Sequence, residues 1–194
     1  ANLCEKTGID VEDISIGIGL DKRIGSRFLR AGPAYGGSCF PKDTRALVYT
    51  SKVSKTNLSV IETVIKSNNK RSDLLLKRIN SILNKKIKNK KITFLGVTFK
   101  ANTDDMRESS SLKMIPYLNK RGAKIRYYDP SGRKSEFDKF KNVNYKPNIN
   151  EACINSDLII IHTEWNEFKL IDLKKIVKKR NFIVYDMRNI YSPE

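Results

Sequence analysis

The run Leu158-Ile159-Ile160-Ile161-His162 is a continuous apolar stretch in a chain of 194 residues. Consecutive aliphatic side chains predict a β-strand buried on both faces, as in a parallel sheet. Other short apolar runs alternate with segments of helical periodicity. The predicted strands cover 92–97, 123–130, 142–145, 158–162 and 182–186, and the predicted helices cover 110–121, 150–154 and 170–179. This alternation predicts right-handed crossovers and a Rossmann-like, doubly wound parallel sheet that binds ligands at the carboxyl ends of its strands.

The residues before the first predicted strand have a helical pattern. Residues 1–20 predict two short helices, with Gly8 as the stop signal of the first and Asp10 as the cap of the second. Residues 57–84 predict one long helix, although the polar run 68–71 interrupts its apolar stripe. Such a helix suits a connector between two domains or a pair with a second copy, and a core helix with a frayed middle stays equally open.

The fold class predicted for the whole chain is α/β, in two domains. Residues 1–88 are expected to form a central helical and dimerisation domain that carries the reactive loop. Residues 89–194 are expected to form a C-terminal Rossmann-like domain, and the lysine-rich segment 85–91 marks the boundary.

The charge balance indicates the kind of ligand. The chain has 38 Lys and Arg against 21 Asp and Glu, a formal net charge of +17 that favours anionic ligands. This charge is also the one feature that points to nucleic acid, but most of the lysines are expected to form a solvated face, so no nucleic-acid partner is expected. No apolar run approaches the ~20 residues of a membrane-spanning helix, and no membrane partner is expected.

Three cysteines, Cys4, Cys39 and Cys153, are an odd number at wide spacing. This spacing favours neither a disulfide framework nor a zinc site, and no metal is expected. A reducing cytoplasm is the compartment that fits, since the first residues have no pattern of a secretory signal.

The segment 30–43, Arg-Ala-Gly-Pro-Ala-Tyr-Gly-Gly-Ser-Cys-Phe-Pro-Lys-Asp, is the strongest candidate for covalent chemistry. Its glycines allow the backbone to approach a ligand closely. Lys42 places a cation near Cys39, and a nearby cation favours the thiolate. If a helix begins near Pro41, Asp43 turns back toward the same pocket and can act as a base. The alternative is that Cys39 is a small buried apolar residue.

The segment 96–109, Gly-Val-Thr-Phe-Lys-Ala-Asn-Thr-Asp-Asp-Met-Arg-Glu-Ser, follows the first predicted strand of the sheet. Lys100 and Arg107 can reach phosphates there, at a position where helix amides also point. The same two cations can instead form ion pairs with Asp104 and Asp105, which would make the segment a self-stabilised loop.

Two further residues follow the strand 158–162. His162 at its end is more typical of a satisfied core residue than of an acid or base. Trp165 is expected to serve as a lid or core aromatic rather than to stack on a base.

The Gly-Gly-Ser-Cys-Phe-Pro-Lys-Asp motif at 36–43 resembles a hallmark of the nucleotide-sugar 6-dehydrogenases, the UDP-glucose/GDP-mannose dehydrogenase family. Arg23-Ile24-Gly25 and the run 28–32 extend the resemblance on one side. Gly-x-x-Phe-Lys followed by Asp-x-Arg-Glu-Ser, within 96–109, is similar to the second hallmark of that family. The resemblance covers essentially the whole chain, from the family's central helical region through its nucleotide-sugar domain.

The resemblance implies an NAD-dependent oxidoreductase that converts UDP-glucose to UDP-glucuronate in two oxidation steps. It implies that Cys39 adds to the C6 aldehyde and forms a thioester, and that Asp43 orients or deprotonates the hydrolytic water. The substrate-binding residues that it implies are Phe28, Leu29, Arg30, Ala31, Gly32, Gly36, Lys100 and Arg188, together with Arg23 lent to a neighbouring subunit. It places Lys42 and Arg107 near the NAD cofactor.

The resemblance also implies an NAD-binding domain ahead of this segment. No Gly-x-Gly-x-x-Gly occurs in the sequence, so the chain is expected to be the C-terminal part of a longer protein. The family uses a Lys and an Asn from the preceding helix, and the chain alone is therefore expected not to turn over. A homodimer through the long helix is expected. The alternatives are a non-catalytic sugar-nucleotide-binding or dimerisation module and a dehydrogenase for a UDP-N-acetylhexosamine or GDP-mannose.

Overall fold

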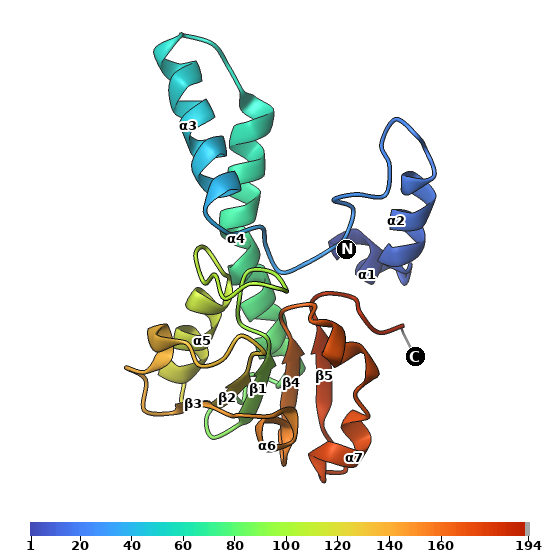
Figure 1. The fold of residues 1–194 in the computed structure, drawn as a ribbon, viewed down its shortest axis with the longest axis vertical. Coiled ribbons are helices and arrows are strands. Elements are labelled where there is room, and N and C mark those ends of the chain that lie inside the picture. The colour runs from blue at the N-terminus through green and yellow to red at the C-terminus, as the bar shows by residue number, and fades with distance from the viewer. Residues whose placement is uncertain (193–194) are drawn as a thin grey trace.

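The structure is a computed structural model that describes residues 1–192, and its centre is one sheet of five parallel strands in the order β3-β2-β1-β4-β5 (Figure 1). The strands are β1 (Lys91–Leu95), β2 (Lys124–Tyr128), β3 (Val143–Tyr145), β4 (Leu158–Ile161) and β5 (Ile183–Asp186). Each overlaps a predicted strand, and the parallel pairing confirms the predicted fold class. The strand order reverses between β1 and β4, so their carboxyl ends flank the crevice where such sheets bind ligands.

β4 explains why this sheet needs cover on both sides. All of its residues are buried, and Leu158 and Ile160 face one apolar core while Ile159 and Ile161 face the other. Successive side chains of a strand point to opposite faces, so one short strand contributes to both cores. The continuous apolar run in the sequence is the direct result.

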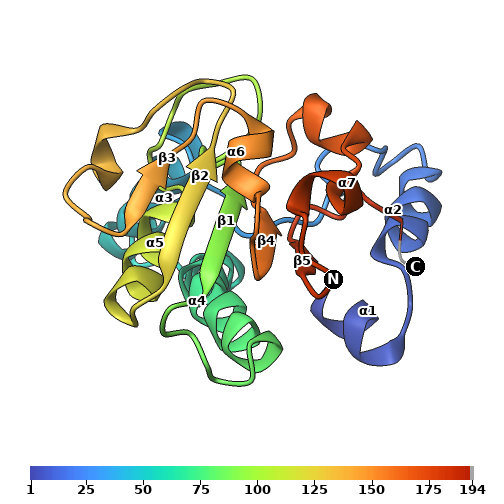
Figure 2. The same ribbon diagram turned by 90° about the horizontal axis from the view of Figure 1, so that it is seen from below.

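Helices cover the two faces of the sheet (Figure 2). On one face, α5 (Ser111–Lys120) and the second half of α4 (Ser59–Ile82) contribute to the larger core. On the other face, α6 (Ile149–Cys153) and α7 (Leu173–Val177) contribute to the smaller core. This arrangement leaves the carboxyl edge of the sheet open toward the N-terminal half of the chain.

α4 is one continuous helix of 24 residues, as predicted, and the polar run 68–71 does not break it. Leu75, Leu76 and Ile79 anchor its second half in the sheet core, where each buried side chain stabilises the fold by roughly 1.5–3 kcal/mol. Its first half extends beyond the sheet and packs against α3 (Cys39–Val53) as an antiparallel hairpin (Figure 1).

The two predicted N-terminal helices are present as α1 (Asn2–Thr7) and α2 (Val11–Gly19). Gly8 ends α1 in the left-handed conformation, and the Asp10 carboxylate caps α2 by accepting a hydrogen bond from the backbone N–H of Glu12. These are the predicted stop and start signals.

Neither α1 nor α2 has a buried residue, and α1 is joined to α4 by polar contacts. An ion pair joins Arg78 to Glu5, and a hydrogen bond joins Arg71 to Asn2. Within residues 1–192, no helix combines the length and the apolar character required to cross a membrane.

The predicted helix at 170–179 is wrong in its extent, since α7 covers only Leu173–Val177. The side chain of Asp172 accepts a hydrogen bond from the backbone N–H of Lys175 and thereby fixes the helix start. Leu170 ends a short 3-10 helix, η2 (Asn166–Leu170), instead. The helical pattern of residues 170–179 predicted a helix, but the Asp172 carboxylate fixes the start of α7 at Leu173.

Asp157 joins the amino ends of β1 and β4 and offers a test of the sheet's pH dependence. Its carboxylate accepts a hydrogen bond from the backbone N–H of Lys91 at 2.7 Å and also contacts the Lys179 amine. Burial by itself would raise the pKa of Asp157, but the bonds from Lys179 and Lys91 outweigh it and hold the pKa below its ordinary value of 3.8.

We expect Asp157→Asn to lower the free energy of unfolding at pH 7 by about 1–3 kcal/mol. A depressed pKa means that this stabilisation is present above the ordinary carboxyl pKa and is lost as the pH falls through the folded value. The difference in the free energy of unfolding between the parent and Asp157→Asn should therefore become smaller below about pH 4. Chemical denaturation at several pH values measures this difference. Asp13→Asn, at an exposed site of α2, is the control and should change little. A deficit that stays constant down to pH 2 would contradict the assignment.

Candidate functional site

A cleft of about 1500 Å³ lies where the base of the α3–α4 hairpin meets the carboxyl edge of the sheet. One wall is the loop at 26–38 with the start of α3, and a second is the middle of α4 around Asn68. The third wall comes from the sheet domain, with Phe99 and Lys100 after β1 and Arg188 after β5. The cleft is thus at the crevice that the strand order predicts.

The structure brings part of the predicted site together. The predicted residues that line the cleft are Phe28, Arg30, Gly32, Gly36, Cys39, Lys100 and Arg188. Those that do not line it are Arg23, Leu29, Ala31, Lys42, Asp43 and Arg107. Phe28 is fully exposed at a φ of 65°, so its ring is free of contacts within the described chain.

The predicted residues outside the cleft are engaged elsewhere. Arg23 pairs with its neighbour Asp21 and is 89% exposed. Lys42 and Asp43 pair with each other at 3.3 Å on the exposed side of α3. The roles proposed for Lys42 and Asp43 therefore require these side chains to change partner.

Cys39 is exposed and lines the cleft, so it is not the buried apolar residue that the sequence left open. α3 begins at Cys39 itself rather than near Pro41, which is the third residue of the helix and needs no hydrogen-bond donor there. The positive end of the helix dipole therefore lies at the sulfur and stabilises negative charge in its vicinity. The Ser38 hydroxyl lies 3.6 Å from the Cys39 sulfur.

Gly36 and Gly37 allow the reactive loop to touch the sheet domain. A Cβ at Gly36 would lie 2.6 Å from the carbonyl oxygen of Glu108, and one at Gly37 would lie 2.8 Å from the Phe99 ring. Gly37 also has a φ of +81° and donates its N–H to the carbonyl of Arg107 at 2.8 Å. Only glycine fits so close an approach, so the two hallmark motifs are in direct contact.

A bidentate ion pair reinforces this contact. Arg45 of α3 donates to the two carboxylate oxygens of Glu108 at 2.9 and 3.1 Å. The hydrogen bonds from Arg45 hold the pKa of Glu108 below its usual range. Arg107 likewise donates to Asp105 at 2.9 Å and lowers the pKa of that carboxyl. The internal pairing that the sequence left open is therefore present for Asp105.

Asn68 is a cleft-lining residue that the sequence did not predict. Its side-chain amide donates to the carbonyl of Tyr35 and accepts from the N–H of Tyr35, each at 3.0 Å. These two reciprocal hydrogen bonds fix the loop onto α4, in the same way that two paired residues of neighbouring strands bond to each other. The signal was present, because Asn68 belongs to the polar run that interrupts the apolar stripe of α4.

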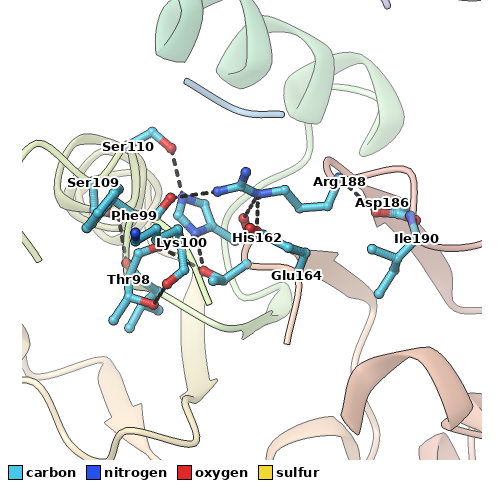
Figure 3. Close-up of polar contacts among 12 residues, drawn as sticks. Thr98, Phe99, Lys100, Ser109, Ser110, His162, Glu164, Asp186, Arg188 and Ile190 are labelled. Carbon is cyan, nitrogen blue, oxygen red and sulfur yellow. Dashed lines mark hydrogen bonds and ion pairs between the residues drawn. The ribbon is translucent and has the colours of Figure 1, made fainter. Parts of the chain in front are cut away.

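Arg188 closes the cleft from the side of β5 (Figure 3). Its guanidinium donates to the carbonyls of His162 at 2.9 Å and Phe99 at 2.7 Å, and it lies 3.0 Å from the Glu164 carboxylate. A Cβ at Gly32 would lie 2.8 Å from the Nη1 atom of Arg188. A side chain at Gly32 would therefore oblige the Arg188 guanidinium to shift, so Gly32 also has a steric role beyond the predicted one.

His162 is a satisfied core residue, as the sequence indicated. The Thr163 hydroxyl donates its hydrogen to the carbonyl of Thr98 at 2.8 Å. The Thr163 oxygen therefore accepts a hydrogen bond from Nδ1 of His162. The other ring nitrogen, Nε2, accepts from the Ser110 hydroxyl at 2.7 Å (Figure 3). Complete burial lowers the pKa of His162 to about 3, assisted by the charge of Arg188. The ring is neutral at physiological pH and acts as a fixed hydrogen-bonded brace.

The charge of the cleft is strongly positive. Among the described residues that line it, the cationic side chains are Arg27, Arg30, Arg71, Lys100 and Arg188, and the acidic one is Asp105. Within residues 1–192, no three His, Cys, Asp or Glu side chains gather closely enough to hold a metal ion. These cationic walls suit a ligand with negative charge, such as a nucleoside diphosphate.

Comparison with known sequences agrees with this geometry. Residues 1–70 match the central domain, and residues 93–193 match the UDP binding domain, of the UDP-glucose/GDP-mannose dehydrogenase family. The two matched ranges together contain Cys39 and nearly all of the sheet. The chain belongs to the UDP-glucose/GDP-mannose dehydrogenase family.

Named relatives cover almost the whole chain. It is 44% identical over 193 residues to the UDP-glucose 6-dehydrogenase of Rickettsia bellii, covering 98% of this chain and 44% of that protein. It is 41% identical over 192 residues to the enzyme of the same name in Rhizobium meliloti, with 98% and 44% covered. The chain therefore spans less than half the length of these relatives.

A solved structure has the same fold. A UDP-glucose dehydrogenase from Pyrobaculum islandicum superimposes with a TM-score of 0.83 at 27% identity, covering 95% of this chain and 41% of that one. The likeness extends over both the helical hairpin and the sheet, since it includes nearly all of the chain.

We expect Gly37→Ala to separate the reactive loop from the sheet domain. The new methyl group would meet the Phe99 ring and force a left-handed φ on alanine, so the free energy of unfolding should fall by about 1–3 kcal/mol. Gly17→Ala is the matched control, because nothing lies within 4 Å of its Cβ and it sits in a helix. That substitution should be neutral or stabilising. Thermal melts compare the two, and equal melting temperatures would refute the close packing at Gly37.

Proposed function

We propose that this chain is the nucleophile-bearing and sugar-nucleotide-binding part of a UDP-glucose 6-dehydrogenase, which oxidises C6 of UDP-glucose to the carboxylate of UDP-glucuronate. The observation that carries the proposal is the exposed thiol of Cys39 on one wall of a cleft whose facing walls present Lys100 and Arg188. The names of the relatives support the same assignment. The unpaired cysteines fit a cytoplasmic protein.

The cationic walls bind the nucleotide in this proposal. Lys100 and Arg188 hold the diphosphate from the side of the sheet, while Arg30 and the backbone around Gly32 and Gly36 wrap the sugar from the side of the loop. Charge-assisted hydrogen bonds to phosphate oxygens are among the stronger polar contacts in proteins, and the low exposure of Arg188 strengthens its contact further. Leu29 and Ala31 are half-buried neighbours in the same loop and help to shape it.

Cys39 supplies the covalent step. After the C6 hydroxyl has been oxidised to an aldehyde, the sulfur adds to that carbon and gives a thiohemiacetal. Loss of a second hydride from C6 leaves a thioester, and water cleaves the carbon–sulfur bond to give the carboxylate and the free thiol. The positive end of α3 stabilises the sulfur anion on release. Asp43, once it leaves Lys42, orients or deprotonates the water.

The reaction removes two hydrides, and NAD+ is a hydride acceptor when bound. The sequence has no Gly-x-Gly-x-x-Gly, and cations in the segments around Cys39 suit contact with the reactive end of the cofactor. Lys42 and Arg107, which are 74% and 68% exposed, are the residues that we assign to this contact. Most of the cofactor site is therefore proposed to lie outside this chain, and the chain alone is proposed not to turn over.

Activity of the full-length gene product tests the nucleophile. We expect Cys39→Ala to abolish UDP-glucose-dependent formation of NADH, whereas Cys4→Ala, which alters a cysteine outside the cleft, should retain it. Absorbance of NADH gives the rate, and UDP binding by calorimetry reports whether the site persists. Undiminished activity of Cys39→Ala would remove the nucleophile and favour a non-catalytic binding module.

A homodimer through the α3–α4 hairpin is the second part of the proposal. The hairpin exposes apolar side chains that the chain itself does not cover: Leu47, Tyr49, Val53 and Val60, each 50–72% exposed. Apolar surface of this extent on a helical hairpin is typical of a subunit interface. Arg23, exposed and not part of the lining of its own cleft, suits a contribution to the partner's cleft.

We expect this chain to be a dimer in light scattering and Val60→Asp to shift it toward the monomer, since a carboxylate would be buried without a partner. Leu170→Asp, at a leucine that is 94% exposed outside the hairpin, is the matched control and should leave the dimer intact. A parent chain that stays monomeric at high concentration would contradict the proposed interface.

A further inference from the structure

Two backbone carbonyls hold the guanidinium of Arg188 in one orientation (Figure 3). Nε donates to the carbonyl of His162 and Nη2 donates to the carbonyl of Phe99. The Arg188 side chain is only 13% exposed. Within residues 1–192, no hydrogen bond uses Nη1, which lies beside Gly32 at the cleft. The unused donors of Arg188 thus face the space where a ligand would lie.

The backbone acceptors for Arg188 are themselves fixed. His162 is braced between the hydroxyls of Ser110 and Thr163, and Thr163 donates in turn to the carbonyl of Thr98. A neutral, fully buried ring cannot change this pattern near physiological pH. The carbonyls around Arg188 therefore provide a rigid frame, but neutral carbonyls alone do not neutralise a buried cation.

Glu164 supplies the charge that the frame lacks. Its carboxylate lies 3.0 Å from Nε of Arg188 without receiving a hydrogen bond, because the Nε hydrogen is directed to the His162 carbonyl. The attraction is consequently one of charge alone. Burial lowers the pKa of Arg188, and the charges of Glu164 and Asp186 oppose that shift. Without Glu164, the positive charge of a largely buried guanidinium would be less neutralised. This would favour a rotamer that turns the Arg188 side chain toward solvent.

We propose that Glu164 is a positioning residue for Arg188, which it orients so that Nη1 meets a phosphate oxygen of the nucleotide in the cleft. The proposal rests on the proposed function, in which the cleft binds a nucleoside diphosphate sugar. Glu164 itself does not line the cleft, so its effect on the ligand passes through Arg188. It must therefore act on affinity for the phosphate part of the ligand and not on affinity for the nucleoside part.

Paired titrations with UDP and with uridine test this distinction. We expect Glu164→Gln to bind UDP at least about five-fold more weakly and uridine as the parent does, because only UDP carries the phosphates. Glu164→Asp, which keeps the charge, should recover part of the UDP affinity. The matched control is Glu167→Gln, which should bind both ligands normally. This carboxylate accepts from the Tyr128 hydroxyl and, within residues 1–192, forms no hydrogen bond or ion pair with Arg188.

A second background separates positioning from a general loss of structure. In Arg188→Met, the further change Glu164→Gln should have no effect on UDP affinity, since the residue through which Glu164 acts is gone. Thermal melts of all variants verify folding.

The possible results distinguish failure of the Glu164 assignment from failure of the proposed function. Equal weakening of UDP and uridine, unchanged or tighter UDP binding in Glu164→Gln, or an undiminished effect in the Arg188→Met background would each overturn the assignment of Glu164 alone. Failure of the parent chain to bind UDP at all would overturn the proposed function and the assignment with it.

Discussion

The close approach of Gly36 and Gly37 to the loop after β1 is the contact on which the site depends. Backbone meets backbone there through the hydrogen bond from Gly37 to the carbonyl of Arg107, and no side chain larger than hydrogen fits between. This contact places the start of α3, and with it Cys39, opposite the carboxyl edge of the sheet. The cleft is a consequence of that juxtaposition and is not a property of either half by itself.

The sheet makes this juxtaposition precise enough for chemistry because its strand ends are locked. β4 is anchored in both apolar cores, and its last residues continue into the hydrogen-bonded chain through His162 and Thr163 to the loop after β1. Asp129, fully buried at the end of β2, accepts the N–H of Val97 at 2.8 Å and holds the same loop from the other side. The walls that bear Lys100 and Arg188 are therefore fixed by polar contacts at a topological switch point.

Much of the fold followed from the sequence because its signals are local. The aliphatic run of β4, the periodic stripe of α4 and the caps at Gly8 and Asp10 each act within a few residues, and the structure agrees with them. The site was predictable only in part. Cys39 and Lys100 lie in motifs, and both line the cleft.

The contacts that sequence reasoning missed join residues far apart in the chain. The amide of Asn68 binds the backbone of Tyr35, and Glu164 faces Arg188 across two loops. No periodicity encodes such pairs, and a polar residue in an apolar stripe shows only that some partner exists. Asp43 illustrates the reverse case, since its motif indicates a role while its carboxylate pairs with Lys42 on the outer side of α3.

The continuity of α4 has a mechanical consequence. Asn68 grips the reactive loop, and Ile79 is embedded in the sheet core on the same helix, about 16 Å further along at 1.5 Å per residue. Because α4 is one continuous helix, a tilt of the hairpin would also displace the part of α4 that packs in the sheet core. The hairpin and the sheet are therefore coupled through one continuous helix.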